Sequence, residues 1–322
     1  MKKLVFAILF ISYGLTAYNQ TISGTIMDKQ TKEKLIFAAV YFSSSFVGTH
    51  TDINGKFVLN ISGNASMPVT VSALGYYSET VTNYTVGKPL IIYLKPKVFE
   101  LKEVVINAKA REKNLKMFKE NFLGTSENAV RCEITNENDI KLIFENDTLK
   151  AYASKPIQII NRGLGYKELY YLDKFWFYTK RSAFLISGNM VFNEDLSSDK
   201  SRKEYYLLSR EQTYHGSRMH FFRALWKNGL ADEGFSLKNV GMGELQYSNI
   251  VVQPDSLKKY LKSQGMMGVC DNMRITTSWM SFIKDYVYFD QRGYFDPFAV
   301  SWDGPMAKQR VGDMLPYEYS MR

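Results

Sequence analysis

The chain has 322 residues, of which 45% are hydrophobic and 23% are charged. This composition is typical of a globular protein with room for two domains, and it argues against a disordered chain or a bundle of membrane helices. The formal net charge is +9 at pH 7, but the basic residues are thinly spread along the sequence. A concentrated surface for nucleic acid is therefore not predicted.

The first 19 residues have the layout of a secretory signal peptide. Lys2 and Lys3 come before an apolar run over residues 4–11, and small or weakly polar residues follow as far as Ala17. The run is shorter than the ~20 residues that a membrane span requires, so cleavage is expected. No later run of about 18 apolar residues occurs, and no transmembrane helix is expected in the mature chain. We therefore predict export to the periplasm, where the protein would be soluble or associated with the outer membrane.

Residues 20–110 are predicted to form a β-sandwich of two packed antiparallel sheets. Short runs of strand-forming residues are separated by turn residues, and no helical period lies between them. Each sheet needs the other to bury its apolar face. The expected strands cover residues 21–27, 38–43, 47–51, 56–61, 69–74, 77–81, 90–94 and 103–107.

Asp52, Asn54, Gly55 and Gly75 are interpreted as structural turn residues. Asn54 and Gly55 suit a hairpin, because glycine adopts positive φ angles at little cost. Asp52 and Asn54 also fit the start of a calcium loop, but the further oxygen ligands and the distal glutamate of such a loop do not follow. No metal site and no cofactor are predicted for this chain.

A series of short motifs follows a fixed order along the same stretch. They are Ile22-Ser23-Gly24-Thr25-Ile26, Ala38-Ala39-Val40, Gly48-Thr49-His50-Thr51-Asp52-Ile53-Asn54-Gly55-Lys56-Phe57, Ala73-Leu74-Gly75-Tyr76 and Glu100-Leu101-Lys102-Glu103-Val104-Val105-Ile106. This order resembles the carboxypeptidase-regulatory-like domain, a transthyretin-like sandwich of seven strands at the N-termini of many exported proteins of the Bacteroidota. The resemblance implies that residues 20–110 are a scaffold or an adaptor.

The resemblance does not imply peptidase activity. The metallocarboxypeptidases bind zinc through a His-x-x-Glu pair and a distant histidine. The histidines of this chain are His50, His215 and His220, and none has a glutamate three positions after it. Carboxypeptidase activity is therefore not expected.

Residues 111–322 are predicted to form an α+β domain with antiparallel strands. Helices are expected over residues 111–124 and 217–228, where apolar side chains recur at helical spacing, and over the short basic segment 255–263. Strands are expected over residues 139–145, 149–153, 158–161, 167–179, 184–191 and 203–209, with ring-rich strands and turns over residues 279–319. Several motifs resemble an uncharacterised companion domain of Bacteroidota proteins, which implies no activity: Asn121-Phe122-Leu123-Gly124-Thr125-Ser126, Tyr214-His215-Gly216-Ser217 and Arg310-Val311-Gly312-Asp313-Met314-Leu315-Pro316.

The aromatic C-terminal tail holds weak candidates for catalysis. Asp290, Asp296 and Asp303 lie among several aromatic rings, and paired carboxylates beside rings are typical of glycosidases. The favoured interpretation is that they are turn residues between strands. Candidates for a binding surface are Tyr214, His215, Arg218 and Trp302.

The two cysteines, Cys132 and Cys270, leave two states open. In an oxidising compartment they could form a disulfide, which would stabilise the fold by about 4 kcal/mol in the chain-entropy model. They could equally remain buried thiols, since a single sequence does not bring them together in space.

These features together predict a non-enzymatic, exported protein of the cell envelope. The sandwich is expected to act as scaffold or adaptor, and the second domain to bind an outer-membrane protein or a glycan. The alternative hypothesis is a hydrolase of envelope polysaccharide that uses carboxylates of the C-terminal tail. The first hypothesis is favoured because the sequence holds no complete set of catalytic residues.

Overall fold

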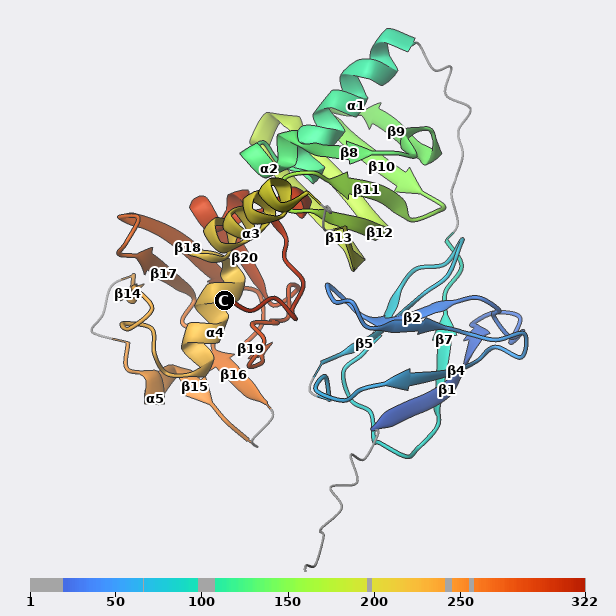
Figure 1. Cartoon of the computed structure of the whole chain (residues 1–322), viewed down its shortest axis with the longest axis horizontal. Helices are drawn as coiled ribbons and strands as arrows, with labels where there is room; N and C mark the ends of the chain where they lie inside the picture. The colour runs from blue at the N-terminus through green and yellow to red at the C-terminus, as the bar shows by residue number, and fades with distance from the viewer. Residues whose placement is uncertain are drawn as a thin grey trace, which may run out of the picture.

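The structure is a computed structural model that describes residues 20–65, 67–97, 108–195, 199–240, 245–254 and 258–321. The predicted mainly β class is confirmed. Figure 1 shows an N-terminal sandwich in blue, a six-stranded sheet in green and smaller sheets in orange and red. The predicted signal peptide and the strand expected over residues 103–107 lie outside the described residues.

The N-terminal sandwich has two sheets. In the first, β1 lies between β4, which is antiparallel to it, and β7, which is parallel to it. The parallel pair differs from the prediction, because the chain crosses the sandwich before β7 joins the free edge of β1. The second sheet is antiparallel, in the order β3-β2-β5-β6. The strands are β1 (Thr21–Asp28), β2 (Ala39–Phe42), β3 (Gly48–His50), β4 (Lys56–Asn60), β5 (Val69–Ser72), β6 (Glu79–Val81) and β7 (Leu90–Leu94).

Alternating side chains build the core of the sandwich. Every second residue of β1 is buried, and Ile22 lies opposite the buried Leu59 of β4. Gly24 lies opposite Phe57 where the packing is tightest, since a Cβ there would come within 2.4 Å of the Leu90 carbonyl oxygen. All residues of β2 and β5 are buried, because their sheet also packs against the rest of the chain.

A long antiparallel hairpin, β12 and β13, organises the six-stranded sheet. The two strands pair along their whole length, with a bulge between Leu172 and Lys174. The other edge of β12 pairs first with β11 and then with β10, and β8 and β9 complete the sheet. The strands are β8 (Cys132–Ile134), β9 (Ile140–Glu145), β10 (Thr148–Ala153), β11 (Ile157–Asn161), β12 (Tyr166–Tyr178) and β13 (Ala183–Glu194).

Helix α1 (Ala108–Phe122) covers the inner face of this sheet. Phe118 and Phe122 are fully buried and contact the rings of Phe175 and Tyr170 on β12. The helix ends at Phe122, and Gly124, which follows two residues later, has a φ of 102°. Short helical turns follow or lie between the strands: α2 (Glu127–Val130), η1 (Glu137–Asp139) and η2 (Thr179–Arg181).

The C-terminal part has its own hydrophobic core around α4. Two antiparallel sheets, in the orders β14-β17-β18-β20 and β15-β16-β19, pack on Phe221, Phe222 and Leu225 of this helix. The elements are α3 (Lys200–Tyr214), α4 (Arg218–Trp226), β14 (Phe235–Asn239), α5 (Tyr247–Ile250), β15 (Val251–Val252), β16 (Lys259–Lys262), β17 (Met266–Asp271), β18 (Thr276–Phe282), β19 (Tyr286–Phe289), β20 (Val300–Asp303), η3 (Pro305–Lys308) and η4 (Val311–Asp313).

The strand predicted over residues 203–209 is wrong, since these residues belong to α3. The Asp199 side chain caps this helix by accepting a hydrogen bond from the Ser201 N–H. Tyr206, Arg210 and Tyr214 then recur every four residues on the buried side. The capping residue and this spacing favour a helix over the strand that the neighbouring tyrosines and leucines suggest.

The helix predicted over residues 255–263 is wrong where the structure describes it. Residues 259–262 form β16, and residues 255–257 lie outside the described residues. Lys259 is buried in this strand, because its Nζ donates hydrogen bonds to the Trp226 carbonyl oxygen at 2.7 Å and to the Tyr247 hydroxyl at 3.0 Å. Lys259, which the sequence analysis places in a basic helix, therefore points into the core.

Among the described residues, no helix is long and apolar enough to cross a membrane.

Candidate binding cleft

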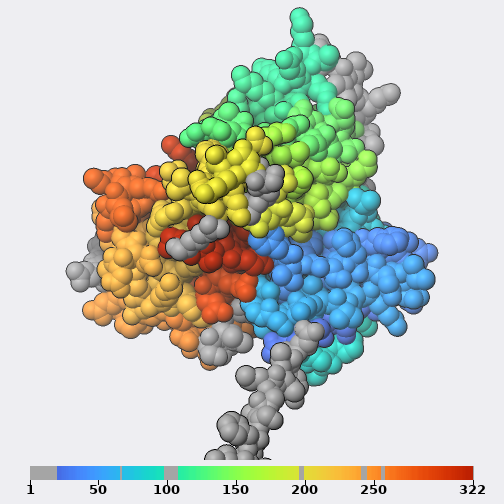
Figure 2. Space-filling model, in the orientation of Figure 1, coloured from blue at the N-terminus to red at the C-terminus, as the bar shows by residue number. Residues whose placement is uncertain are grey.

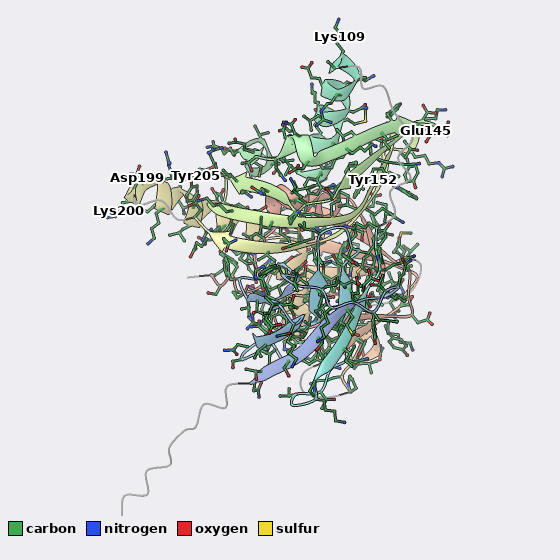
Figure 3. The ribbon with its side chains drawn as sticks, turned by 90° about the vertical axis from the view of Figure 1, so that its right-hand side faces the viewer. Lys109, Glu145, Tyr152, Asp199, Lys200 and Tyr205 are labelled. Carbon is green, nitrogen blue, oxygen red and sulfur yellow. The ribbon has the colours of Figure 1, made fainter. Side chains whose placement is uncertain are left out.

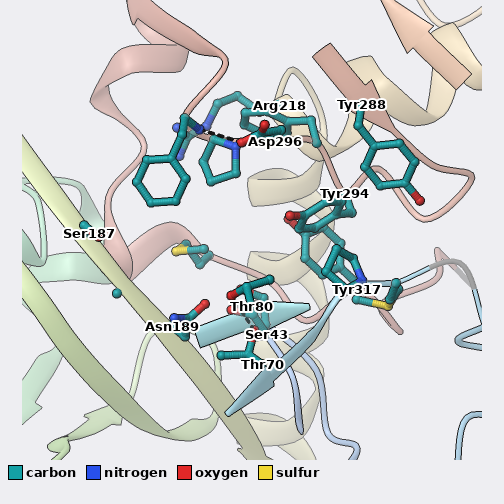
Figure 4. A pocket seen from close by; sticks show the side chains of 18 of the residues that line it. Ser43, Thr70, Thr80, Ser187, Asn189, Arg218, Tyr288, Tyr294, Asp296 and Tyr317 are labelled. Carbon is teal, nitrogen blue, oxygen red and sulfur yellow. Dashed lines mark hydrogen bonds between the residues drawn. The ribbon is translucent and has the colours of Figure 1, made fainter. Parts of the chain in front are cut away.

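A cleft of about 1120 Å³ lies where the sandwich, the six-stranded sheet and the C-terminal part meet. Figure 4 shows Ser43, Thr70 and Thr80 from the sandwich between Ser187 and Asn189 of β13 and the rings of the C-terminal part. The cleft is larger than the ~300–1000 Å³ of an ordinary small-molecule pocket, so it has room for an extended ligand.

The sandwich contributes a wall of hydroxyl groups, which we call the hydroxyl wall: Ser43, Thr70, Ser78, Thr80 and Thr82. The strand register explains how two of these hydroxyl groups come together. Thr70 of β5 lies opposite Thr80 of β6, and their hydroxyls are 3.1 Å apart in a hydrogen bond. Alternation along both strands turns these side chains outward, away from the sandwich core. Thr70 itself is fully buried, whereas Ser43 and Ser78 are half-buried and Thr80 and Thr82 are exposed. The wall therefore offers the hydroxyl groups of these four residues as donors and acceptors.

Strand β13 forms the wall beside it. Ser187, Gly188 and Asn189 line the cleft. Gly188 lets the strand pass close to its neighbour, since a Cβ there would lie 2.5 Å from the Tyr171 carbonyl oxygen and 2.5 Å from the Tyr170 ring. The register shift in β12 occurs beside this point. A bulge of this kind redirects side chains, and here it lies next to the cleft.

The C-terminal part contributes four tyrosines in series, which we call the tyrosine row: Tyr260, Tyr288, Tyr294 and Tyr317. Successive ring centroids are 5.7, 5.8 and 5.7 Å apart. All four side chains are half-buried, so each keeps a surface that a ligand can reach. Burial raises the pKa of the Tyr294 and Tyr317 hydroxyls, which therefore stay protonated as donors at neutral pH.

The aspartates that line the cleft each have partners. Asp296 forms an ion pair with Lys284 at 2.8 Å, and Asp173 forms one with Lys97 at 3.3 Å. Asp313 accepts hydrogen bonds from the Ser126 hydroxyl and the Asn128 amide. Arg218 also lines the cleft, where desolvation lowers its pKa and its guanidinium donates to the Gln309 carbonyl oxygen.

The turn over residues 43–46 fixes the sandwich against the other two parts. The Ser44 N–H donates to the Met190 carbonyl oxygen, and Ser45 accepts from the Phe192 N–H, so the turn adds a short parallel pairing to β13. The Ser44 carbonyl oxygen accepts from the Tyr317 N–H at 2.8 Å. Figure 2 shows the result, with red C-terminal atoms packed between the orange atoms and the blue sandwich. The cleft is therefore already formed in the structure.

The structure separates the three aspartates proposed as catalytic candidates. Asp290 is fully buried, and its carboxylate accepts hydrogen bonds from the Arg292 and Tyr294 N–H groups. Asp296 reaches the cleft, where it also accepts from the Phe298 N–H. Asp303 is exposed at the end of β20 and accepts from the Gly304 N–H. Backbone contacts of this kind are those of turn residues, and the hydrolase hypothesis stays a prediction.

Of the four residues proposed for binding, Arg218 is the one that lines the cleft. Tyr214 is buried against the core of the six-stranded sheet, and its ring packs on those of His215 and His220. Trp302 is half-buried and packs on the core around α4. The binding role of these residues stays a prediction.

His220 has a neutral ring with a fixed tautomer. Its Nδ1 accepts a hydrogen bond from the Gly216 N–H, so its Nε2 donates to Glu233 at 3.0 Å. Desolvation lowers the pKa of His220, and the hydrogen bond from His220 lowers that of Glu233. Among the described residues, no group of three or more histidines, cysteines or carboxylates is arranged to hold a metal ion.

The proposed turn residues lie in the turns of the sandwich. Asp52 accepts hydrogen bonds from the N–H groups of Asn54 and Lys56, which lowers its pKa. Gly55 and Gly75 have φ angles of 67° and 79°. Both cysteines are free thiols in the structure: Cys132 is half-buried beside the core of the six-stranded sheet and Cys270 is buried in β17.

Comparison with known proteins identifies the first third of the chain. Residues 22–106 match the family model of the CarboxypepD_reg-like domain, so the resemblance found in the sequence is confirmed for this part. The match ends before α1 begins. A comparison with curated proteins finds no match.

One solved structure similar to this chain is a Bacteroides fragilis protein described as membrane-associated and of unknown function. It is 12% identical, and the comparison covers 83% of this chain and 92% of that chain at a TM-score of 0.19. A TM-score this low carries no conclusion about this protein. The signal peptide, the bacterial phylum and the companion domain stay predictions.

Proposed function

We propose that this chain is a non-enzymatic, exported binding protein of the cell envelope whose cleft takes up a glycan strand. Residues 20–110 serve as the scaffold that supplies one wall, and residues 111–322 supply the rest of the site. The protein acts in the periplasm or at the outer membrane, after removal of residues 1–19.

The observation that carries this proposal is the tyrosine row facing the hydroxyl wall. Apolar faces of sugar rings pack on aromatic rings, and an aromatic ring supplies a large contact area with few rotatable bonds. Sugar hydroxyls exchange hydrogen bonds with serine, threonine and asparagine side chains, all of which line the opposite walls. The centroid spacings of 5.7 to 5.8 Å place each tyrosine ring in contact with the next, so the four rings form one continuous aromatic surface.

A glycan fits these observations better than an outer-membrane protein does. The lining is concave, and hydroxyl groups from the sandwich lie in it beside apolar side chains such as Met219, Phe298 and Leu315. A sugar ring has both an apolar face and hydroxyl groups, so it matches this mixed surface. The aspartates in the cleft are engaged in ion pairs or hydrogen bonds, which supports binding rather than proton transfer as the role of the site.

The test is binding of the chain from Gln20 onward to immobilised envelope polysaccharides, compared with the variant Tyr288→Ala. We expect Tyr288→Ala to weaken binding by about tenfold or more, which corresponds to the loss of one aromatic hot spot. Tyr93→Ala is the matched control, because Tyr93 is an exposed tyrosine of β7 that is not part of the cleft lining.

Equal binding by wild type and Tyr288→Ala would contradict the proposal, as would failure of the wild type to bind any polysaccharide tested. Release of soluble fragments that stops in Asp296→Asn would instead support the hydrolase hypothesis.

A further inference from the structure

The outer face of the six-stranded sheet carries a second group of aromatic and basic side chains beside the cleft. We call it the basic aromatic face: Lys141, Lys150, Tyr152, Lys174, Trp176 and Tyr178. The pairing of the strands brings these residues together, since Lys150 lies opposite Trp176, Thr148 opposite Tyr178, and Tyr152 opposite Lys141. Figure 3 shows Tyr152 and Glu145 at the end of the sheet opposite to α3, which carries Lys200 and Tyr205.

Trp176 is the centre of this face. Its ring is half-buried, and two lysine ammonium groups lie over it, with the Lys174 Nζ at 4.5 Å and the Lys150 Nζ at 5.8 Å from a ring centroid. Such contacts hold the ammonium groups beside the ring without neutralising their charge. An anionic group bound by either lysine therefore lies next to the Trp176 ring.

The charge of the surface is positive after its ion pairs are counted. Glu145 lies 4.0 Å from Lys150, and Asp147 pairs with Lys180 at the hairpin tip at 2.7 Å. The three lysines of the basic aromatic face (Lys141, Lys150 and Lys174) against Glu145 leave +2, and the pair at the hairpin tip adds no net charge. A cluster of this sign beside an aromatic platform suits a ligand that carries anions along its length.

The basic aromatic face is continuous with the cleft. Lys174 belongs to both, and Leu185, which lies opposite Trp176 on β13, also lines the cleft. Tyr77 of the sandwich lines the cleft as well. Burial, and to a smaller extent the neighbouring Tyr77, raise the pKa of Tyr152. A strand that occupies the cleft can therefore continue over Trp176 without leaving the surface.

We propose that the ligand is an acidic polysaccharide, which binds the cleft through its sugar rings and the basic aromatic face through its anionic groups. This inference rests on the glycan-binding function proposed above, and it adds the chemical class of the glycan. Trp176 stacks on a sugar ring, while Lys150 and Lys174 contact carboxylate, sulfate or phosphate groups on the neighbouring units.

The test compares charged and neutral forms of the same polymer. Polygalacturonate is paired with its methyl ester, and dextran sulfate with dextran, so that each pair differs in its anionic groups and the two pairs separate carboxylate from sulfate. We expect the wild-type chain to bind at least one acidic form about tenfold more tightly than its neutral partner at low salt, with a preference that falls as salt is raised.

The variants assign this preference to the basic aromatic face. The double variant Lys150→Gln/Lys174→Gln should lose most of the roughly tenfold preference and keep its binding to the neutral form. Lys150→Arg/Lys174→Arg should retain the preference, because charge and ring contact are both preserved. Lys200→Gln/Lys203→Gln on α3 removes the same charge from exposed positions elsewhere and should change little.

Each outcome decides between the two proposals. Equal affinity for the acidic and neutral forms would overturn this inference and leave the glycan-binding function standing. A preference that survives in Lys150→Gln/Lys174→Gln would also overturn it. If the chain binds an envelope polysaccharide but none of the four polymers, this inference is overturned. If it binds no polysaccharide at all, the proposed function itself is wrong.

Discussion

The buried side chain of Glu168 allows a direct measurement of how burial of an ionisable group affects the stability of this protein. The side chain is 1% exposed within the core of the six-stranded sheet, and desolvation raises its pKa to about 8 from 4.5. One oxygen accepts a hydrogen bond from the Asn161 amide at 3.1 Å, and the other has no hydrogen-bond partner among the described residues. Glu168 is therefore a neutral carboxylic acid in the folded protein at neutral pH.

The substitution Glu168→Gln should stabilise the protein at neutral pH and not at low pH. Between pH 4.5 and 8 the unfolded chain loses the Glu168 proton and the folded chain keeps it, so stability falls by about 1.4 kcal/mol per pH unit. The cost reaches about 3 kcal/mol at pH 7. Glutamine keeps the bond from Asn161 and never ionises, so the variant escapes this cost.

The measurement is urea unfolding of both proteins at pH 5, 6, 7 and 8. The difference in unfolding free energy should be small at pH 5 and should grow in favour of Glu168→Gln up to about pH 8, where it levels off. Glu204→Gln is the control, because Glu204 is exposed on α3. A difference that stays constant from pH 5 to pH 8 would refute the reasoning, since it would mean that Glu168 has the same protonation in both states.

Two further predictions concern the joint with the sandwich and the cysteines. Asp173→Ala should lower stability by about 3 kcal/mol, because it leaves the ammonium group of Lys97 buried without its partner and removes the acceptor of the Ser78 N–H. Asp173→Asn should cost less, because its amide oxygen can still accept a hydrogen bond from the Ser78 N–H. Thermal unfolding measures both losses, and equal losses would mean that this hydrogen bond contributes nothing and that the ion pair with Lys97 accounts for the whole effect. Cys132 and Cys270 should react with a thiol reagent only in denaturant, since burial raises the pKa of Cys132 and Cys270 is buried. A native protein without free thiols would contradict the structure.

The sandwich could be predicted from the sequence because its signals are local. The turn at Asn54-Gly55 needs two adjacent residues, and the alternation of Phe57 and Leu59 needs three. The hairpin predicted at this turn is wrong, because β3 and β4 on either side of it belong to different sheets of the sandwich. The parallel pairing of β1 with β7 could not be predicted in this way. It depends on which edge of β1 is free after the other strands have paired, and that is decided by the whole sandwich.

The predicted strand over residues 203–209 and the predicted helix over residues 255–263 are wrong for different physical reasons. Residues 203–209 contain residues that favour strands, and the helix is decided by a cap at Asp199, outside that window. For β16 the decisive contacts are distant in sequence, since Lys259 enters the core only because the Trp226 carbonyl oxygen and the Tyr247 hydroxyl lie there to accept its hydrogen bonds. Tertiary contacts override local preference in the second case.

The cleft could not be predicted from the sequence at all. Its lining runs from Ser43 to Tyr317, and no stretch of the chain holds enough of it to form a motif. Threonines at alternate positions of β5 and β6 look like solvent-facing strand residues until a second surface is placed opposite them. The four tyrosines of the tyrosine row are likewise separate in the sequence, and their spacing appears only when β16 and β19 pair.

The proposed binding function therefore depends on how the sandwich packs against the parts of the chain that follow it. The turn over residues 43–46 forms hydrogen bonds to β13 and to Tyr317, which fixes the distance between the hydroxyl wall and the tyrosine row. A domain with the same core but a different turn would pack differently and leave no such cleft. To learn about ligand binding, one should therefore compare related sandwiches at the outward-facing side chains of β2, β5 and β6. The buried residues that define the sandwich family report the fold of this part and not its ligand.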